Sequence, residues 1–235
     1  MSTLKPTRRV SKHHKLKEDR VVTASSRIID AASGNRNVLT IAGIAVIVLI
    51  AGFIGFRQWR QVQEGRAAEA IAEPVRAYEQ GLYREALDGV AGSTGLTGVI
   101  SRYGSTPTGN LARFYAADAH YKLGEYDQAE ELFSDYDKGS DYLGASAYAG
   151  EAAILQQKGE NARAAALFEK AADVFESELT TPQYLADAAS AYEAAGNYSK
   201  ATSLLERIKD DYASSQQARD VDMLLARVEA KAESR

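Results

Sequence analysis

Few side chains in this sequence of 235 residues are of a type that could do chemistry, and the three histidines come first. His13 and His14 are adjacent in a segment rich in lysine and arginine, where two imidazoles without a third ligand do not make a metal site. His120 lies in a helical segment with no serine or carboxylate spaced to form a catalytic group with it. We therefore expect His120 to be a structural residue and not a general base.

The rest of the sequence excludes most catalytic classes. It has no cysteine, which excludes disulfides, thiol nucleophiles, thiolate metal sites and lipid attachment through an N-terminal cysteine. It has no phosphate-binding glycine loop, no zinc-binding helix motif and no nucleophile elbow. Acidic pairs such as Glu130/Glu131 and Asp210/Asp211 are expected on solvated helix faces. We therefore predict no enzymatic activity, no cofactor and no metal site.

Helix-forming residues dominate the sequence after residue 60. Alanine, glutamate, leucine, arginine and glutamine are common there, whereas valine and isoleucine, which favour strands, are sparse. The common residues lose little side-chain freedom in a helix. The composition therefore predicts an all-α fold for this part of the chain.

Four segments share one pattern of residues. In each, a glycine is followed five residues later by an alanine and, four residues after that, by a large apolar residue. The glycine–alanine pairs are Gly81/Ala86, Gly124/Ala129, Gly159/Ala164 and Gly196/Ala201, and the large residues are Val90, Phe133, Phe168 and Leu205. Glycine suits the left-handed conformation that ends a helix, and alanine suits a close contact between helices. The pattern therefore predicts helical hairpins, in which the large residue fills the groove against the next hairpin.

These segments resemble tetratricopeptide repeats, which are helix–turn–helix units that stack into a superhelix. Successive glycines are 43, 35 and 37 residues apart, and the family repeats every ~34 residues. Tyr83, Tyr126 and Tyr198 are expected as packing wedges at the start of the second helices, where Asn161 replaces the aromatic residue in one repeat. The family's tryptophan early in the first helix and its final proline are missing. Its glycine in mid-helix is replaced by Ala117, Ala152 and Ala189.

The layout of about residues 18–212 is also similar to a bacterial group of single-pass inner-membrane proteins with a divergent tetratricopeptide domain, which includes the ancillary subunit of the Sec translocon. Residues 95–129 carry this similarity best. It implies a protein–protein interaction module whose partner is the translocon, a periplasmic chaperone or a secreted polypeptide. The alternative is a cell-envelope scaffold protein that associates with itself as a homo-oligomer.

The repeat pattern sets the helices that we expect. A helix over residues 57–80, kinked at Pro74, ends at Gly81 and pairs with 83–90. An insertion over 92–109 contains a short helix at 96–103. The remaining expected pairs are 110–122/126–136, 144–157/161–176 and 183–195/198–211, with Thr181 as a helix cap before Pro182 and a capping helix over 215–232.

By analogy with the family, the first helix of each hairpin lines a concave groove. Seven residues on these helices are expected to contact a protein partner: Phe114, Asp118, Tyr121, Lys122, Gln156, Gln157 and Glu193. Exposed aromatic rings beside polar groups would hold an extended peptide or a helix. In the alternative, Phe114 and Tyr121 pack between repeats.

A transmembrane helix is predicted at residues 37–56, because 38–56 contain no charged residue. At ~1.5 Å per residue these 19 residues extend over ~28 Å, close to the ~30 Å of a bilayer's hydrocarbon core. A cleaved signal peptide is disfavoured because the apolar run is longer than the ~7–15 residues of a signal and no cleavage site follows. Ala51 and Gly55 form one small-xxx-small pair, a spacing that can bring two such helices together, but we expect them to be small residues scattered in a lipid-facing helix.

The charges predict the orientation of this helix. Residues 1–37 carry nine basic and three acidic side chains, whereas the chain after residue 56 carries 19 basic and 29 acidic ones. A basic flank stays in the cytoplasm, so the expected domains are a disordered cytoplasmic tail (1–17), an amphipathic juxtamembrane helix (18–36), the transmembrane helix and a periplasmic repeat domain (57–235) of a bacterial inner-membrane protein. The basic clusters are explained by this topology, and we expect no nucleic acid partner.

Overall fold

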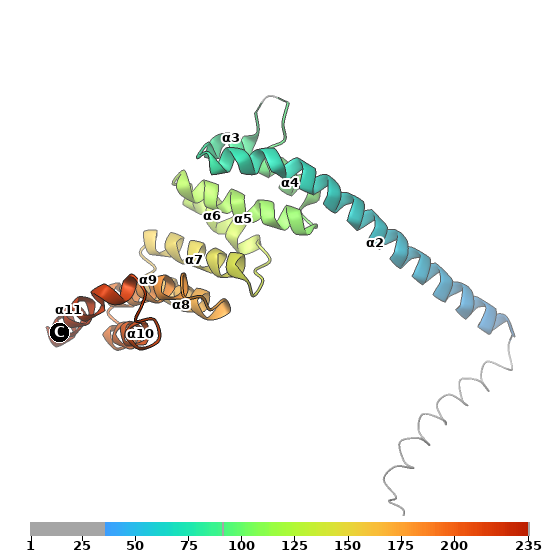
Figure 1. Ribbon diagram of the computed structural model, residues 1–235. Coiled ribbons are helices and arrows are strands. Elements are labelled where there is room, and N and C mark those ends of the chain that lie inside the picture. Colours follow the sequence, from blue (N-terminus) through green and yellow to red (C-terminus); the bar gives the residue numbers. More distant parts are fainter. Residues whose placement is uncertain (1–35, 91, 235) are drawn as a thin grey trace, which may run out of the picture. The chain divides into compact units, whose positions relative to one another are not determined.

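The computed structural model describes residues 36–90 and 92–234, which form helices and turns with no strand among them. The helices in chain order (Figure 1) are α2 (Arg36–Glu79), α3 (Tyr83–Asp88), α4 (Leu96–Tyr103), α5 (Pro107–Lys122), α6 (Tyr126–Asp135), α7 (Tyr142–Gln157), α8 (Asn161–Val174), α9 (Thr181–Ala194), α10 (Tyr198–Asp211), the 3-10 helix η1 (Gln217–Asp220) and α11 (Val221–Glu233). The predicted all-α fold is confirmed for these residues. The predicted tail (1–17) and, apart from Arg36, the predicted juxtamembrane helix (18–36) lie outside them.

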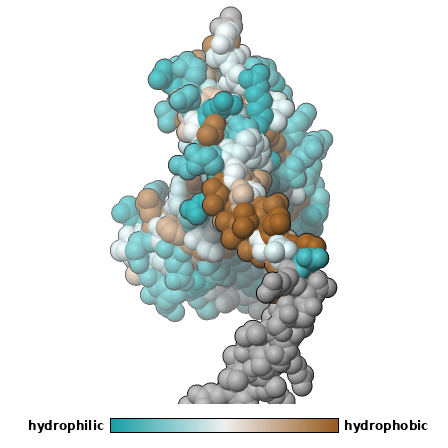
Figure 2. Space-filling model, turned by 90° about the vertical axis from the view of Figure 1, so that its right-hand side faces the viewer, coloured by the Kyte–Doolittle hydropathy of each residue, from teal (hydrophilic) through white to brown (hydrophobic). Residues whose placement is uncertain are grey.

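The chain divides into two units, Met1–Trp59 and Arg60–Arg235. In the first unit, the large apolar side chains of α2 are exposed: Ile47 is 67% exposed and Leu49 is 72% exposed. Leu39–Glu79 is long and apolar enough to cross a membrane, with a mean hydropathy of 2.6 in its most apolar window, none of which is buried. Figure 2 shows apolar residues gathered at the start of α2, beside the grey atoms.

The second unit contains four helical hairpins with the same turn. Each first helix ends in a glycine with φ between +76° and +79°: Gly81, Gly124, Gly159 and Gly196. In each turn the glycine N–H donates to the carbonyl three residues back, at 2.9–3.0 Å, and the next N–H donates to the carbonyl five residues back, at 2.8–2.9 Å. This is the Schellman motif, in which only a residue that tolerates positive φ fits without strain. The predicted turns are confirmed.

Three of the second helices lie between the first helix of their own hairpin and the helix that follows. The second helix α6 packs against α5 and α7, α8 against α7 and α9, and α10 against α9 and α11 (Figure 1). The predicted close contacts are confirmed, since Ala86, Ala129, Ala164 and Ala201 are completely buried. The hairpins therefore stack into a tetratricopeptide-like solenoid, which α11 covers at its carboxyl end.

The predicted groove-filling residue is correct in three hairpins and wrong in the first. Phe133, Phe168 and Leu205 are at most 4% exposed, but Val90 is 45% exposed. The cause is Gly89, which has φ +82° and ends α3 at Asp88, so that Val90 lies in the following loop. A side chain at residue 89 would also meet the backbone oxygen of Ser93 at 2.6 Å.

Several helices begin earlier than predicted. Thr106 caps α5, which therefore begins at Pro107, by accepting a hydrogen bond from Gly109 N–H at 3.0 Å. Asp141 caps α7 in the same way through Gly144 N–H at 2.8 Å. Side-chain capping of this kind pairs N–H groups that have no partner within the helix.

The start of α9 and the end of the chain also differ from prediction. Thr181 is the first residue of α9 and not its cap; its hydroxyl accepts a hydrogen bond from Ser177 N–H at 2.9 Å. The last predicted helix (215–232) is two elements, η1 and α11. Helix α2 continues through Pro74 to Glu79.

A candidate protein-binding surface

Side-chain hydrogen bonds link two of the three pairs of neighbouring first helices. The hydroxyl of Tyr78 on α2 donates a hydrogen bond to Asp118 on α5. The hydroxyls of Ser146 on α7 and Tyr184 on α9 lie 3.2 Å apart. The pairs α2/α5 and α7/α9 are thus tied side by side, and α5 also contacts α7, so the first helices follow one another along the solenoid.

Two of the predicted partner-binding residues are packed inside the repeats. Phe114 and Tyr121 are half-buried members of one apolar cluster. The ring of Tyr121 lies 5.7 Å from the ring of Tyr126, and the ring of Phe114 lies 5.7–6.0 Å from three others, those of Tyr115, Phe133 and Tyr136. These rings pack within the hairpin of α5 and α6, and since both side chains are only half-buried, their contact with a partner stays a prediction.

Two further predicted residues, Asp118 and Lys122, differ in how accessible they are to a partner. Asp118 is half-buried and accepts the hydrogen bond from Tyr78. Burial first, and then the hydrogen bond to Asp118, raise the pKa of Tyr78, so its hydroxyl stays protonated and donates. Lys122 is exposed, with its Nζ 5.8 Å from the centre of the Tyr121 ring. A partner on this surface would meet Lys122 before Asp118.

The last three predicted residues, Gln156, Gln157 and Glu193, also differ in their exposure. Gln157 is exposed and Gln156 is half-buried. Glu193 is 8% exposed and binds α11: Arg227 Nε lies 3.0 Å from Oε1, and Lys231 Nζ lies 2.8 Å from Oε1. Burial acts to raise the pKa of Glu193, but the hydrogen bonds from Arg227 and Lys231 outweigh it and lower the pKa. Helix α11 therefore pairs with Glu193, and partner binding by all seven residues stays a prediction; Lys122 and Gln157 are the most exposed of them.

The expected structural histidine connects two adjacent turns. His120 Nδ1 lies 2.6 Å from Glu125 Oε2, and Arg84 pairs with the other carboxylate oxygen. Hydrogen bonds from Arg84 and then His120 lower the pKa of Glu125. These contacts give His120 the structural role that was predicted.

The acidic pairs are solvated with one exception. Glu131, Asp210 and Asp211 are exposed, as expected. Glu130 is half-buried and pairs with Lys158 of the next hairpin at 2.5 Å. This carboxylate helps to join two repeats.

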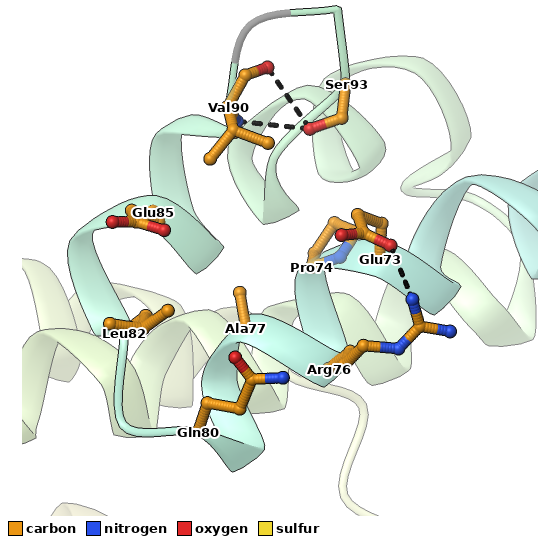
Figure 3. A pocket seen from close by; sticks show the side chains of 10 residues that line it. Glu73, Pro74, Arg76, Ala77, Gln80, Leu82, Glu85, Val90 and Ser93 are labelled. Carbon is orange, nitrogen blue, oxygen red and sulfur yellow. Dashed lines mark hydrogen bonds and ion pairs between the residues drawn. The ribbon is translucent and has the colours of Figure 1, made fainter.

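A small hollow lies where α2 meets α3 and the loop after it (Figure 3). Its volume is about 100 Å³, below the ~300 Å³ at which small-molecule pockets begin. Glu73 pairs with Arg76 at 3.0 Å, and Val90 N–H donates to Ser93 Oγ at 3.1 Å. At this volume the hollow has room for little more than one side chain.

A second opening, which the sequence did not reveal, is larger and more polar. This polar cleft has a volume of about 410 Å³ and lies between the start of α5 and the connection from α6 to α7. Its lining comprises Arg60, Gly104, Ser105, Thr106, Pro107, Asn110, Arg113, Asp135, Tyr136, Asp137, Gly139 and Asp141. The residues come from three separate stretches of the sequence, so no local motif marks them. Among the described residues, no group of three or more histidines and carboxylates is placed to hold a metal ion.

The comparisons define the class of protein. Residues 35–180 match the family described as tetratricopeptide repeat-like domain. The match covers more than half of the chain, so the chain belongs to this family. No curated protein matches the chain in sequence.

Two solved structures share the fold. They are TPR-like repeats of Podosopora anserina, named for a kinesin light chain, and a variant of the same repeats. Their TM-scores are 0.53 and 0.54, at 20% and 19% identity, over 74% of this chain and 87% of theirs. At this identity the likeness concerns the fold alone, which is that of a protein-interaction scaffold.

Proposed function

We propose that this protein is a single-pass inner-membrane protein that presents its repeats to a protein partner in the periplasm. The observation that carries the proposal is the exposed apolar surface of α2 from Leu39 to Trp59. A monomeric soluble protein rarely exposes so large an apolar patch, whereas an uncharged helix of this length fits a bilayer. The solenoid would supply the surface to which a polypeptide partner binds.

The distribution of charge supports the orientation. The nine basic residues before the apolar run would hold the amino terminus in the cytoplasm, and the acidic repeat unit would follow the helix to the other side. Phe56 and Trp59, whose ring centres lie 6.0 Å apart, stand where aromatic side chains settle at a membrane interface. By the resemblance described above, the partner would be the Sec translocon, a periplasmic chaperone or a secreted polypeptide.

The topology is tested by fusing alkaline phosphatase or a green fluorescent protein to the carboxyl terminus in a bacterial host. The phosphatase folds in the periplasm and the fluorescent protein in the cytoplasm, so we expect an active phosphatase and a dark fluorescent fusion. The opposite result would refute the periplasmic location of the repeats and, with it, all of the proposed partners.

The partner is tested by photo-crosslinking in cells. A photoreactive residue at Gln157 or Lys122, both exposed on first helices, should capture an envelope protein. The control is Ser203, exposed on the second helix α10, which should capture none. A product at twice the mass of the chain would support the self-associating scaffold instead, and equal capture from all three positions would contradict a specific surface.

A further inference from the structure

The first helices of the hairpins begin on one edge of the repeat unit. The polar cleft joins Arg60, the first residue of this unit, to the start of α5 and to the connection before α7. One turn further along α2, Glu64 accepts hydrogen bonds from Thr108 on α5. The rings of Tyr142, which begins α7, and Phe175, which follows α8, lie 6.4 Å apart. The starts of α5 and α7 and the connection from α8 to α9 therefore share the edge at which the chain enters the unit, which we call the entry edge.

Three large apolar side chains on the entry edge are exposed. Leu179, in the connection from α8 to α9, is 82% exposed, which is more than Leu49 on α2 at 72%. Tyr142 is 52% exposed and Phe175 is 36% exposed. A single exposed leucine is common on protein surfaces, but this one follows four residues after a pair of exposed rings that touch each other. The three side chains form one apolar patch.

The connection that carries Leu179 is held by hydrogen bonds. Ser177 N–H donates to Thr181 Oγ1 at 2.9 Å, and Thr181 N–H donates to the Ser177 carbonyl at 3.0 Å. Leu179 N–H donates to Ser177 Oγ at 3.2 Å. An ordered turn thus presents the leucine, so that little backbone freedom is lost when the leucine enters an apolar phase.

The course of the chain and the charges of the edge indicate what covers the patch. The uncharged run of the proposed span ends at Phe56, and three residues link it to Arg60 on the entry edge. Aromatic rings favour the membrane interface, and leucine favours the apolar layer beneath it. Glu178 is exposed beside Leu179; its carboxylate would attract the ammonium group of a zwitterionic lipid, whereas anionic lipids would repel it.

We propose that the entry edge docks on a zwitterionic bilayer surface through Leu179, Phe175 and Tyr142. The leucine enters the apolar layer, and the two rings lie at the level of the headgroups. The repeat unit then has a second contact with the membrane, far along the chain from the anchor. The inference rests on the proposed function, because the anchor is what brings the entry edge to the bilayer.

The test uses the full chain in phosphatidylcholine vesicles. Because the chain has no cysteine, one introduced cysteine carries a fluorophore at a chosen position. Ser140→Cys places it on the entry edge, two residues before Tyr142, and Gln157→Cys places it at the other end of α7. A phospholipid with a nitroxide on its headgroup quenches fluorophores near the surface. We expect quenching at residue 140 to be at least threefold stronger than at residue 157, and weaker when phosphatidylglycerol replaces part of the phosphatidylcholine.

Substitutions in the Ser140→Cys chain identify the side chain that makes the contact. Leu179→Ser should reduce the quenching at least twofold, whereas Leu179→Phe, which keeps a large apolar side chain, should preserve it. Leu123→Ser is the matched control, since Leu123 is 37% exposed and follows the end of α5, away from the entry edge. This control should leave the quenching unchanged. Thermal unfolding of the repeats shows whether each variant is folded.

Equal quenching at residues 140 and 157 would overturn the proposal, and so would undiminished quenching in Leu179→Ser or in phosphatidylglycerol. Energy transfer between two labelled Ser140→Cys chains, in place of quenching by lipid, would identify a second copy as the occupant and would also overturn it. A label at Ile47→Cys reports the anchor, and a lipid with a nitroxide in its acyl chain should quench it. Quenching at residue 47 without quenching at residue 140 refutes this inference and leaves the proposed function standing, whereas no quenching at residue 47 refutes the membrane anchor itself.

Discussion

The two ends of α2 contain similar apolar residues and place them in opposite environments. Ile47 is 67% exposed, whereas Ile71 is 8% exposed and packs in a cluster with residues of α3, α4 and α5. The difference lies in the pattern. No charged residue occurs from Leu39 to Phe56, but after Arg60 apolar residues alternate with charged residues at helical spacing. One apolar stripe is enough for a helix that packs on protein, whereas a helix that is apolar on all sides needs burial on all sides, in protein or in lipid.

The largest effect should come from placing charged residues in the amino-terminal part of α2. Ile47→Arg together with Ile50→Arg places two cations near the middle of the proposed span, at a cost of about 5–7 kcal/mol for insertion. We expect the variant to leave the membrane fraction on alkaline carbonate extraction. The control is Val62→Arg, which changes an exposed residue beyond the span and should keep the protein in the membrane. Retention of the double variant in the membrane would show that α2 does not cross it.

Shortening a buried side chain in the carboxyl-terminal part of α2 should affect folding and not membrane attachment. Ile71→Ala removes buried atoms from the cluster with α3–α5 and should reduce the free energy of unfolding by about 2–5 kcal/mol. Ile54→Ala, at a side chain that is 61% exposed, is the matched control and should leave the unfolding of the repeats unaltered. Chemical denaturation in detergent, followed by circular dichroism, measures both. Equal losses would contradict a division of α2 into two environments.

The repeats were predictable because their signals are local. Each Schellman turn requires a glycine directly after the first helix, and the buried alanine follows this glycine at a fixed spacing. Gly124 and Ala129 could therefore be placed without knowledge of the fold. The error at Val90 arose from a second local signal, Gly89, which stops α3 before the pattern is complete. Competing local signals explain what was missed in the fold.

The binding surface was less predictable, because it depends on contacts between distant residues. Family positions could not show that the ring of Phe114 packs against three aromatic neighbours, or that α11 binds Glu193. The polar cleft joins Arg60, the start of α5 and the connection from α6 to α7. Nothing in the sequence near Tyr136 indicates that this residue lies at the junction.

Two glycines also distinguish the environments along α2, with a smaller effect on stability. One lies within α2, and the other lies in the turn that follows it. Gly81 has φ +77°, so Gly81→Ala should destabilise the repeats by about 1–2 kcal/mol through left-handed strain. Gly65 is helical, and a Cβ there would meet nothing within 4 Å, so Gly65→Ala should stabilise the protein by about 0.5–1 kcal/mol. Unfolding midpoints would show opposite signs. A loss of stability in Gly65→Ala would contradict a continuous helix between the two environments.

The smallest effect should appear at Glu64, which fastens α2 to α5 just beyond the proposed span. Its Oε2 accepts a hydrogen bond from Thr108 N–H at 3.2 Å, and its Oε1 accepts one from Thr108 Oγ1 at 2.6 Å. That N–H is among the first of α5 and has no partner inside the helix. Burial opposes ionisation here, but the hydrogen bonds from Thr108 outweigh it and lower the pKa of Glu64 below 4.5.

A lowered pKa in the folded protein means that the carboxylate stabilises the fold above about pH 4.5, and that this contribution is lost as the pH falls through the folded pKa. Glu64→Gln should therefore reduce the free energy of unfolding by about 0.5–1 kcal/mol at pH 7, with a smaller difference from wild type at pH 3.5. Glu69, exposed on the same helix, is the control, and Glu69→Gln should change neither value. If Glu64→Gln lost the same stability at both pH values, the charge of Glu64 would not be what secures this part of α2 to α5.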